Sequence, residues 1–269
     1  MTELIDSSQQ FERRFAGLSR LYGVQGAKAI ACAHIVVVGI GGVGSWAVEA
    51  LARSGVGELT IIDLDHISES NINRQIHALS DTLGMSKVLA MKHRVQQINP
   101  ACKVNCVDDF VTPENWLEIV KAFERPEISG LIDACDQASA KLTLSAWAAK
   151  RGTEYPGFHF ITVGAAGGKR LAQKVDIADL TKVTHAPLLA QLRNKLRRDF
   201  GLASGGKNMG VHCVFSAEGV KMPDPSCDAA SDGSLNCHGY GSSVSVTSTF
   251  GQCAAGWICD QIAHSATKK

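Results

Sequence analysis

The side chains best suited to chemistry in this chain are cations, amides and a carboxylate that follow apolar segments. Asn73, Arg74 and Gln75 stand together, Lys87 follows them, and Asp136 comes just after a later apolar segment. Arginine binds phosphate oxygens bidentately and stays charged, and lysine adds a point charge. A carboxylate can hold Mg²⁺ against the phosphates of a nucleotide. This set favours a triphosphate whose pyrophosphate must leave, so it predicts ATP and Mg²⁺ rather than NAD.

The stretch from His34 to Asp65 is predicted to form the nucleotide-binding unit. An apolar run at 35–38 meets a glycine-rich turn, a helical pattern follows, and a second apolar run at 59–62 ends in Asp63 and Asp65. A helix N-terminus after such a turn offers free N–H groups to a phosphate, and Asp63 is placed for a ribose hydroxyl. Asp65, two residues later, is also expected to bind the nucleotide. The glycines expected to line the nucleotide are Gly39, Gly41, Gly42 and Gly44.

Strand and helix patterns alternate along the chain. Strands are predicted at 35–38, 59–62, 102–107, 130–136, 160–163 and 213–218, and helices at 11–33, 82–98, 138–150 and 187–200. This alternation predicts an α/β fold, a Rossmann-like doubly wound sheet that binds ligands at the carboxyl ends of its strands. We expect a single domain with a helical lead-in (11–33), a nucleotide-binding core (34–168) and an extension (169–269). Residues 222–242 are rich in Pro, Ser, Asp and Gly and should be mobile.

Several of these residues also have simpler interpretations. Asp136 could cap the helix at 138–150. Lys87 lies in the first turn of its helix, where a cation opposes the helix dipole, so a functional reason is suspected. The helix at 187–200 is a candidate for binding RNA phosphates or is a solvated face. Its cations are Arg193, Lys195, Arg197 and Arg198.

Composition sets further limits. The net charge is +1, so any nucleic-acid surface must be local. The nine cysteines include no CxxC pair, which argues against a zinc ribbon, and an odd number without a secretion signal predicts a reducing cytoplasm. Residues 233–259 carry no charged side chain, yet their Ser, Thr and Gly content favours a buried strand and helix over a membrane span.

Five motifs in order carry a family resemblance: the glycine turn, Asp63-x-Asp65, Asn71-x-Asn73-Arg74-Gln75, Lys87 and Asp133-x-x-Asp136. Over residues 11–168 they resemble the ATP-dependent adenylating domain of ubiquitin-activating and molybdopterin-synthase-activating enzymes. Nearly the whole chain is similar to the bacterial tRNA threonylcarbamoyladenosine dehydratases. The stretches that carry this closer resemblance are 14–23, 73–78, 107–113 and 213–216. It implies ATP-dependent cyclisation of the threonylcarbamoyl group on the adenosine next to the anticodon, through an acyl adenylate.

The resemblance also implies roles for single residues. The four glycines would line the nucleotide loop, Asp63 would bind ribose, and Asp136 would bind Mg²⁺. The phosphates would be held by Asn73, Arg74, Gln75 and Lys87. In this family an arginine near the N-terminus reaches the ATP of the other subunit of a homodimer, and Arg14 fits best, with Arg13 one residue away.

Other functions stay open at this level. One is activation of a ubiquitin-like or sulfur-carrier protein, which would make a sulfur-relay protein a partner. Others are an NAD-dependent oxidoreductase and an inactive scaffold. Cys237 is the cysteine to test first, although an incidental thiol is favoured. Glu218, His212 and His77 are unranked candidates for assisting proton transfer.

Overall fold

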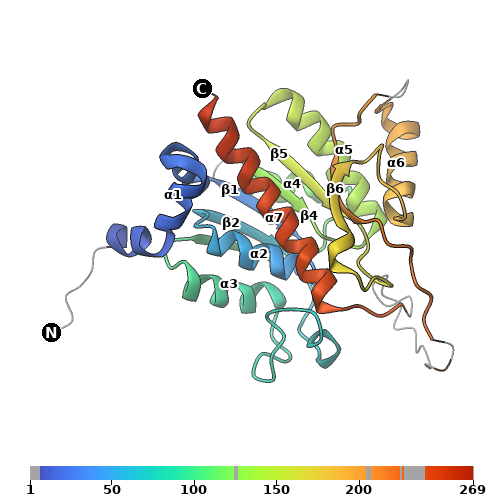
Figure 1. Ribbon diagram of the computed structural model, residues 1–269, viewed down its shortest axis with the longest axis horizontal. Helices are drawn as coiled ribbons and strands as arrows, with labels where there is room; N and C mark the ends of the chain where they lie inside the picture. The colour runs from blue at the N-terminus through green and yellow to red at the C-terminus, as the bar shows by residue number, and fades with distance from the viewer. Residues whose placement is uncertain (1–6, 124–126, 204–206, 225, 227–239, 269) are drawn as a thin grey trace.

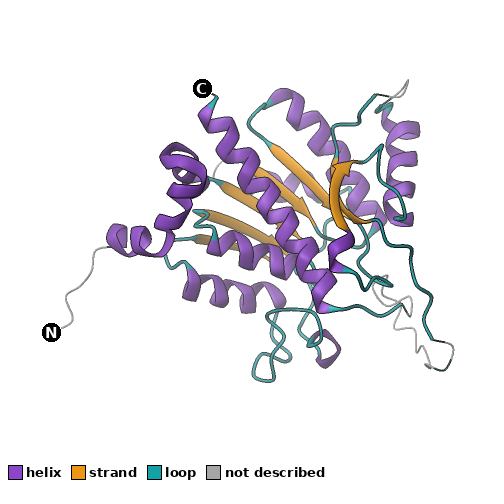
Figure 2. Cartoon of the chain, viewed as in Figure 1, coloured by secondary structure: helices purple, strands orange, loops and turns teal. Residues whose placement is uncertain are grey.

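The computed structural model describes residues 7–123, 127–203, 207–224, 226 and 240–268, without the side chains of residues 7–9. Its centre is a seven-stranded sheet in the order β3-β2-β1-β4-β5-β7-β6 (Figures 1 and 2). Neighbouring strands run parallel, except that β6 is antiparallel to β7. The strands are β1 (His34–Val38), β2 (Glu58–Ile62), β3 (Lys103–Val107), β4 (Gly130–Asp133), β5 (His159–Val163), β6 (Val175–Asp179) and β7 (His212–Ser216). The predicted α/β fold is confirmed.

Helices cover both faces of the sheet. They are α1 (Ser7–Cys32), α2 (Gly44–Arg53), α3 (Lys87–Ile98), α4 (Trp116–Lys121), α5 (Ala138–Glu154), α6 (Pro187–Phe200) and α7 (Val244–Thr267), with short 3₁₀ helices η1 (Glu69–Asn71) and η2 (Ala172–Lys174). Successive side chains of a strand point to opposite faces. Thus Ile35 and Val37 of β1 pack in the core beneath α1, α2, α3 and α7, whereas Val36 and Val38 pack with α4, α5 and α6. Burial on both faces explains why β1 is apolar throughout.

The strand order reverses between β1 and β4, since β1 pairs with β2 on one side and β4 on the other. Connections from β1 and β4 therefore leave in opposite directions, and a crevice opens at the carboxyl ends of these strands. The glycine turn follows β1 and Asp136 follows β4, so both predicted elements of the site meet at this switch point.

Three features differ from the sequence expectations or refine them. Strand β6 was not predicted, because it is a half-exposed edge strand whose sequence, VDIAD, lacks a continuous apolar run. The lead-in is one helix broken at Gly23, which has φ 73°. Residues 244–267 form α7 alone, and the strand expected beside it is absent from residues 240–259.

The uncharged C-terminal stretch is buried against protein. Val246, Phe250, Ala254 and Ile258, spaced by four residues on α7, are fully buried. Across the described ranges, no helix is long and apolar enough to span a membrane. Most of the segment expected to be mobile, 222–242, lies outside the described residues, and so does Cys237.

Candidate functional site

The glycine loop after β1 has two glycines that packing requires, one that lies against the Arg74 side chain (Gly42) and one that faces open space (Gly41). A Cβ on Gly39 would lie 2.8 Å from the carbonyl oxygen of Ala134, and one on Gly44 would lie 1.7 Å from that of Gly39. A Cβ on Gly41 would meet only Gln75 Nε2, at 3.9 Å. The backbone at Gly41 is therefore open to a ligand, and it precedes the N-terminus of α2, where N–H groups and the helix dipole favour a phosphate.

Asp63, Asp65 and Lys87 form a charged group at the end of β2. Lys87 Nζ lies 2.6 Å from Asp65 Oδ2 and 3.7 Å from Asp63 Oδ1. Asp63 also accepts hydrogen bonds from the backbone N–H of Ile40, at 2.6 Å, and of Asp65, at 2.9 Å. Burial nonetheless raises the pKa of the Asp63 carboxyl, with the nearby Lys87 ammonium acting against it. The two carboxylates explain how a lysine is accommodated in the first turn of α3.

The loop after η1 fixes the second cation. Arg74 Nη1 donates to the carbonyl of Ser70 at 2.6 Å and to Asn73 Oδ1 at 2.9 Å, and the carbonyl of Arg74 accepts from Trp46 Nε1 at 2.9 Å. Gln75 is buried beside the glycine loop, and its Oε1 has no hydrogen-bond partner. The guanidinium is thus held at the edge of the crevice, backed by a buried amide.

The two acids at the end of β4 have different roles. Asp133 is fully buried, and its Oδ2 accepts from Lys141 Nζ at 3.1 Å and from Thr162 Oγ1 at 2.6 Å. It therefore stabilises the junction of β4, α5 and β5 from inside. Asp136 is half-exposed and faces the crevice, and the N-cap of α5 is Gln137, so Asp136 is not the N-cap residue. Among the described residues no three His, Cys, Asp or Glu side chains gather as a metal site, but Mg²⁺ usually binds through one or two carboxylates and substrate phosphates. Asp136 fits that role.

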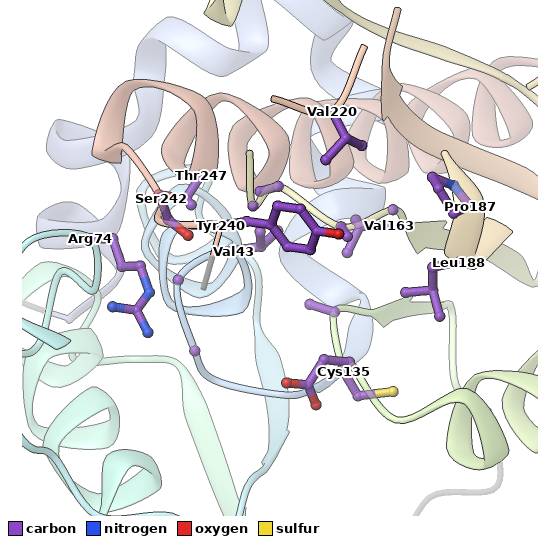
Figure 3. Close-up of a pocket in the computed structure, with 18 of the residues that line it drawn as sticks. Val43, Arg74, Cys135, Val163, Pro187, Leu188, Val220, Tyr240, Ser242 and Thr247 are labelled. Atoms are coloured by element: carbon purple, nitrogen blue, oxygen red, sulfur yellow. The ribbon is translucent and has the colours of Figure 1, made fainter. Parts of the chain in front are cut away.

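Two cavities meet at the switch point. The first is lined by Asp63, Asp65 and Lys87 on one side and by Asp109, Phe110 and Val111 on the other. The second, of about 470 Å³, has apolar walls from β5, α6 and α7 and contains Tyr240 (Figure 3). Both cavities are lined by Gly41, Ala134, Cys135 and Asp136. The glycine loop and Asp136 therefore separate a polar crevice of about 80 Å³ from the larger apolar cavity.

Most predicted site residues are brought together here. The residues that line one cavity or the other are Gly39, Gly41, Gly42, Asp63, Asp65, Arg74, Lys87 and Asp136. Gly44 and Gln75 are buried behind them, and the exposed Asn73 donates through Nδ2 to the carbonyl of Ser242 at 3.2 Å.

Arg14 lies away from the site of its own chain. Its Nη1 donates to the carbonyls of Gln97, at 3.3 Å, and Ile98, at 2.7 Å, at the C-terminal end of α3. Lys87 begins that helix, and a rise of 1.5 Å per residue separates the two ends by about 16 Å. Arg14 therefore does not contribute to the phosphate site within its own chain.

The three candidates for proton transfer are not supported by their positions. His212 begins β7, at the sheet edge opposite the site, and stacks on Trp257 with ring centroids 4.6 Å apart. Glu218 accepts from the backbone N–H of Arg170 and Leu171, at 2.9 and 2.8 Å. His77 is buried, and burial together with the Lys87 charge lowers its pKa to about 4. His212 and Glu218 have structural contacts, and His77 lines neither cavity.

The basic helix α6 is only partly available to a ligand. Arg193 Nη1 donates to the carbonyls of Leu180, at 3.2 Å, and Val183, at 3.0 Å, so this half-buried side chain is turned toward two loops. Arg197 and Arg198 are exposed, and Arg198 pairs with Asp199 at 2.6 Å.

Sequence reasoning missed two aromatic residues. Phe110 follows β3 and lines the polar crevice with Asp63 and Lys87. Its position just past a strand end, inside the motif at 107–113, was a usable signal. Tyr240 lines the second cavity together with Gly41 and Gly42. The sequence around it gives no signal, because Tyr240 is far from the glycine loop along the chain and only the fold brings the two together.

Comparison with known proteins gives the family. The model of the ThiF family matches residues 12–264. The chain belongs to the ThiF family. It is 43% identical over 253 residues to the tRNA threonylcarbamoyladenosine dehydratase of Escherichia coli (strain K12), which covers 91% of each chain. The resemblance that the sequence motifs indicated is thereby confirmed.

Solved structures agree with this assignment. A crystal structure of the E. coli dehydratase in complex with ATP matches this ThiF-family chain with a TM-score of 0.85 and 39% identity, covering 99% of each chain. A complex of that enzyme with AMP matches with the same TM-score and identity and covers 100% of each chain. The shared fold therefore extends through the lead-in and the C-terminal extension.

Proposed function

We propose that this ThiF-family enzyme uses ATP to dehydrate the threonylcarbamoyl group on the adenosine next to the anticodon of tRNA, through an acyl adenylate. The observation that carries this proposal is the junction of the two cavities at Gly41 and Asp136. An acyl adenylate forms when a carboxylate attacks the α-phosphorus of ATP, so nucleotide and carboxylate must reach one point from different sides. The names of the relatives and their ATP and AMP complexes support the same activity.

The chemistry needs no enzyme nucleophile. A threonyl carboxylate is a poor electrophile because oxide would have to leave. Transfer of AMP from ATP to the carboxylate releases pyrophosphate and makes AMP the leaving group. The carbamoyl group of the same side chain then attacks the acyl carbon, and the original carboxylate oxygen departs in AMP. Both reacting groups belong to one side chain, so ring closure gains from proximity.

The site residues have separate tasks in this proposal. The backbone at Gly41 and Gly42 faces the phosphates, and Asp63 accepts from ribose hydroxyls. Arg74 and Lys87 neutralise the departing pyrophosphate, and Mg²⁺ held by Asp136 would share that charge. Asn73 and Asp65 hold the cations in place, and Gln75 lies beside the backbone of Gly41. The pairing of Lys87 with Asp65 supports this division, because it keeps the ammonium at the crevice edge.

The test is nucleoside analysis of threonylcarbamoyladenosine-bearing tRNA after incubation with the protein, ATP and Mg²⁺. We expect the modified nucleoside to lose one water and the nucleotide products to be AMP and pyrophosphate. Formation of ADP and phosphate would reject adenylation. Adenylate formation on a carrier protein, with tRNA unchanged, would instead favour the sulfur-carrier alternative and its sulfur-relay partner.

We further propose that the enzyme is a homodimer with composite sites. An N-terminal arginine would serve the ATP site of the partner, because Arg14 lies about 16 Å along α3 from the phosphate site of its own chain. Helix α1, which carries Arg14, exposes Leu21 and Val24, each 72% accessible, and a second copy would cover them. Arg13 is exposed one residue earlier, so either arginine fits this role.

Complementation tests the composite site. Arg14→Ala and Asp136→Ala proteins are mixed under conditions that exchange subunits. If the arginine acts in trans, each mixed dimer has one intact site. Half of the dimers are mixed at random, so about a quarter of wild-type activity should return. No recovery despite proven exchange would refute the proposal for Arg14, and recovery only with Arg13→Ala would shift the role by one residue.

Helix α6 is proposed to contact tRNA through Arg197 and Arg198. Their replacement by alanine should weaken tRNA binding and flatten its salt dependence without changing ATP affinity. Lys150→Ala on α5 is the matched control, since its side chain is 81% exposed at the end of the helix far from the site. An unchanged salt slope would leave α6 as a solvated face.

The remaining proposals concern organisation and location. One adenylating domain is supported by α7, which packs from the C-terminal extension against α1 and α2 in the same core. A cytoplasmic location is supported by the described cysteines, all seven of which are free thiols.

A further inference from the structure

The apolar cavity adjoins a third cavity, of about 590 Å³, which has a different character. The two share Met222, Tyr240 and Ser242, so these residues form the wall between them. The third cavity is lined by Lys169, Arg170 and Lys221, with one acid, Asp224. An apolar cavity that opens on the catalytic junction thus lies beside a cavity of net positive charge.

The backbone around this wall is held in place at three points. Gly168 N–H donates to the carbonyl of Gly241 at 3.0 Å, and the N–H of Lys221 donates to the carbonyl of Gly168 at 2.9 Å. A Cβ on Gly168 would lie 2.8 Å from Val220 Cγ1, and its φ is +70°, so only glycine fits. On the far side, Ser242 is tied to Asn73. The two residues that follow Tyr240 are therefore anchored, Gly241 by a backbone hydrogen bond and Ser242 by the Asn73 amide.

The Tyr240 ring is placed to face a ligand. In Figure 3 it projects across the middle of the cavity, with Arg74 and Ser242 to one side and Pro187 and Leu188 to the other. Tyr240 is the only aromatic side chain among the described residues that line this cavity. A cavity of 470 Å³ falls in the range of roughly 300–1,000 Å³ that small-molecule sites occupy.

The cations of the adjoining cavity differ in their availability. Lys169 is buried, and its Nζ donates to the carbonyls of His185 and Glu218, so it holds the surrounding loops together. Arg170 and Lys221 are exposed at the cavity. Asp224 accepts hydrogen bonds from the N–H and hydroxyl of Ser226, at 2.9 and 2.7 Å, which partly satisfies its charge. The two exposed cations are thus the groups that can meet an anion.

We propose, on the basis of the proposed function, that Tyr240 is the stacking platform for the target adenine of the tRNA and that Arg170 and Lys221 bind the phosphate beside it. Proteins recognise single-stranded RNA by splaying a base onto an aromatic ring while cations follow the backbone. The two adjoining cavities match this pattern. With the base on Tyr240, the threonylcarbamoyl group extends toward Asp136, and the phosphate of the same nucleotide enters the basic cavity. The adenosine end of ATP enters the separate crevice lined by Asp63 and Phe110, so the two adenines do not compete.

The experiment compares Tyr240→Leu with Tyr240→Phe. Leucine keeps an apolar group but removes the π-face, whereas phenylalanine keeps the ring and removes only the hydroxyl. We expect Tyr240→Leu to raise the KM for tRNA by about 5- to 150-fold, the range for loss of one stacked base, and Tyr240→Phe to stay within about 3-fold of wild type. ATP affinity, measured by calorimetry, and Tm should not change in either variant.

The phosphate contacts are tested by salt dependence of tRNA binding, with an ATP analogue that cannot be cleaved. Arg170→Ala combined with Lys221→Ala should reduce the slope of log K against log salt by about 0.7, the value for one neutralised phosphate of a single strand. Lys150→Ala, the exposed control on α5, should leave the slope unchanged. Tyr240→Leu should weaken binding without altering the slope, because stacking releases no counterions.

The outcomes separate this inference from the proposed function. Suppose that the wild-type protein cyclises the threonylcarbamoyl group of tRNA. An unchanged KM in Tyr240→Leu then overturns the stacking assignment alone, and an unchanged salt slope in the double variant overturns the phosphate assignment alone. Equal losses in Tyr240→Leu and Tyr240→Phe would assign the effect to the hydroxyl and overturn stacking. A wild-type protein that leaves tRNA unmodified would remove the proposed function, and this inference with it.

Discussion

Replacing Gly41 by alanine should remove activity while leaving the fold intact, and replacing Gly44 by alanine should damage the fold itself. Both glycines belong to the same loop, but a Cβ on Gly41 would have only Gln75 Nε2 near it, at 3.9 Å. A Cβ on Gly44 would lie 1.7 Å from the carbonyl oxygen of Gly39. The pair therefore separates a glycine that leaves room for a ligand from one that packing requires.

The magnitudes follow from this geometry. Gly41 has no left-handed φ, so alanine is compatible with its backbone conformation. The change is expected to stabilise the fold by about 0.4–1 kcal/mol, because alanine lowers the conformational entropy of the unfolded chain. This corresponds to a Tm rise of no more than about 4 °C. Its methyl group would occupy the approach to the phosphates, and a displacement of about 1 Å typically costs about 100-fold in rate. For Gly44 the backbone must shift by more than an ångström, and overpacking of this kind costs about 1–3 kcal/mol, or about 2–12 °C in Tm.

The assay pairs thermal unfolding with ATP-dependent cyclisation of tRNA. Gly41→Ala should not lower the Tm but should reduce kcat/KM for ATP by about two orders of magnitude. Gly44→Ala should instead lower the Tm. Near-normal turnover in a stable Gly41→Ala protein would show that no phosphate approaches this backbone. A marked fall in its Tm would show that the open space beside Gly41 is needed for folding.

Three further predictions concern charged groups. Arg74→Ala and Asp136→Ala should each lower turnover by roughly 100-fold with little change in Tm, and normal turnover in either would refute its place in the site. The pKa of His77 is lowered from 6.5 to about 4 in the folded protein, so as the pH falls the imidazole is protonated first in the unfolded chain. Stability should be complete above about pH 6.5 and fall by about 3 kcal/mol as pH drops to 4, and His77→Gln should flatten this part of the profile in urea titrations. Lys141→Met should cost about 3–5 kcal/mol because it leaves the Asp133 carboxylate buried without its cation, and adding Asp133→Leu should restore much of the loss in the same titrations.

The sequence by itself determined the nucleotide half of the site. Strand β1 is buried on both faces, so it is read as one apolar run, and the glycine turn and α2 follow within a few residues. Asp63, Lys87 and Asp136 each follow or begin an element that a local pattern predicts. Because parallel strands place their carboxyl ends at one edge, these residues were expected together without knowledge of side-chain contacts.

Only the tertiary structure decided which cations are exposed and where the second cavity lies. Arg193 and Arg197 are alike in sequence, but one turns inward to two loop carbonyls and the other faces solvent. The edge strand β6 is half-exposed and carries no apolar signal. Tyr240 lines the cavity beside Gly41 and Asp136 because backbone hydrogen bonds of Gly168 with Gly241 and Lys221 bring together segments far apart in the chain. Such contacts depend on how distant elements pack, and no local pattern of residues encodes them.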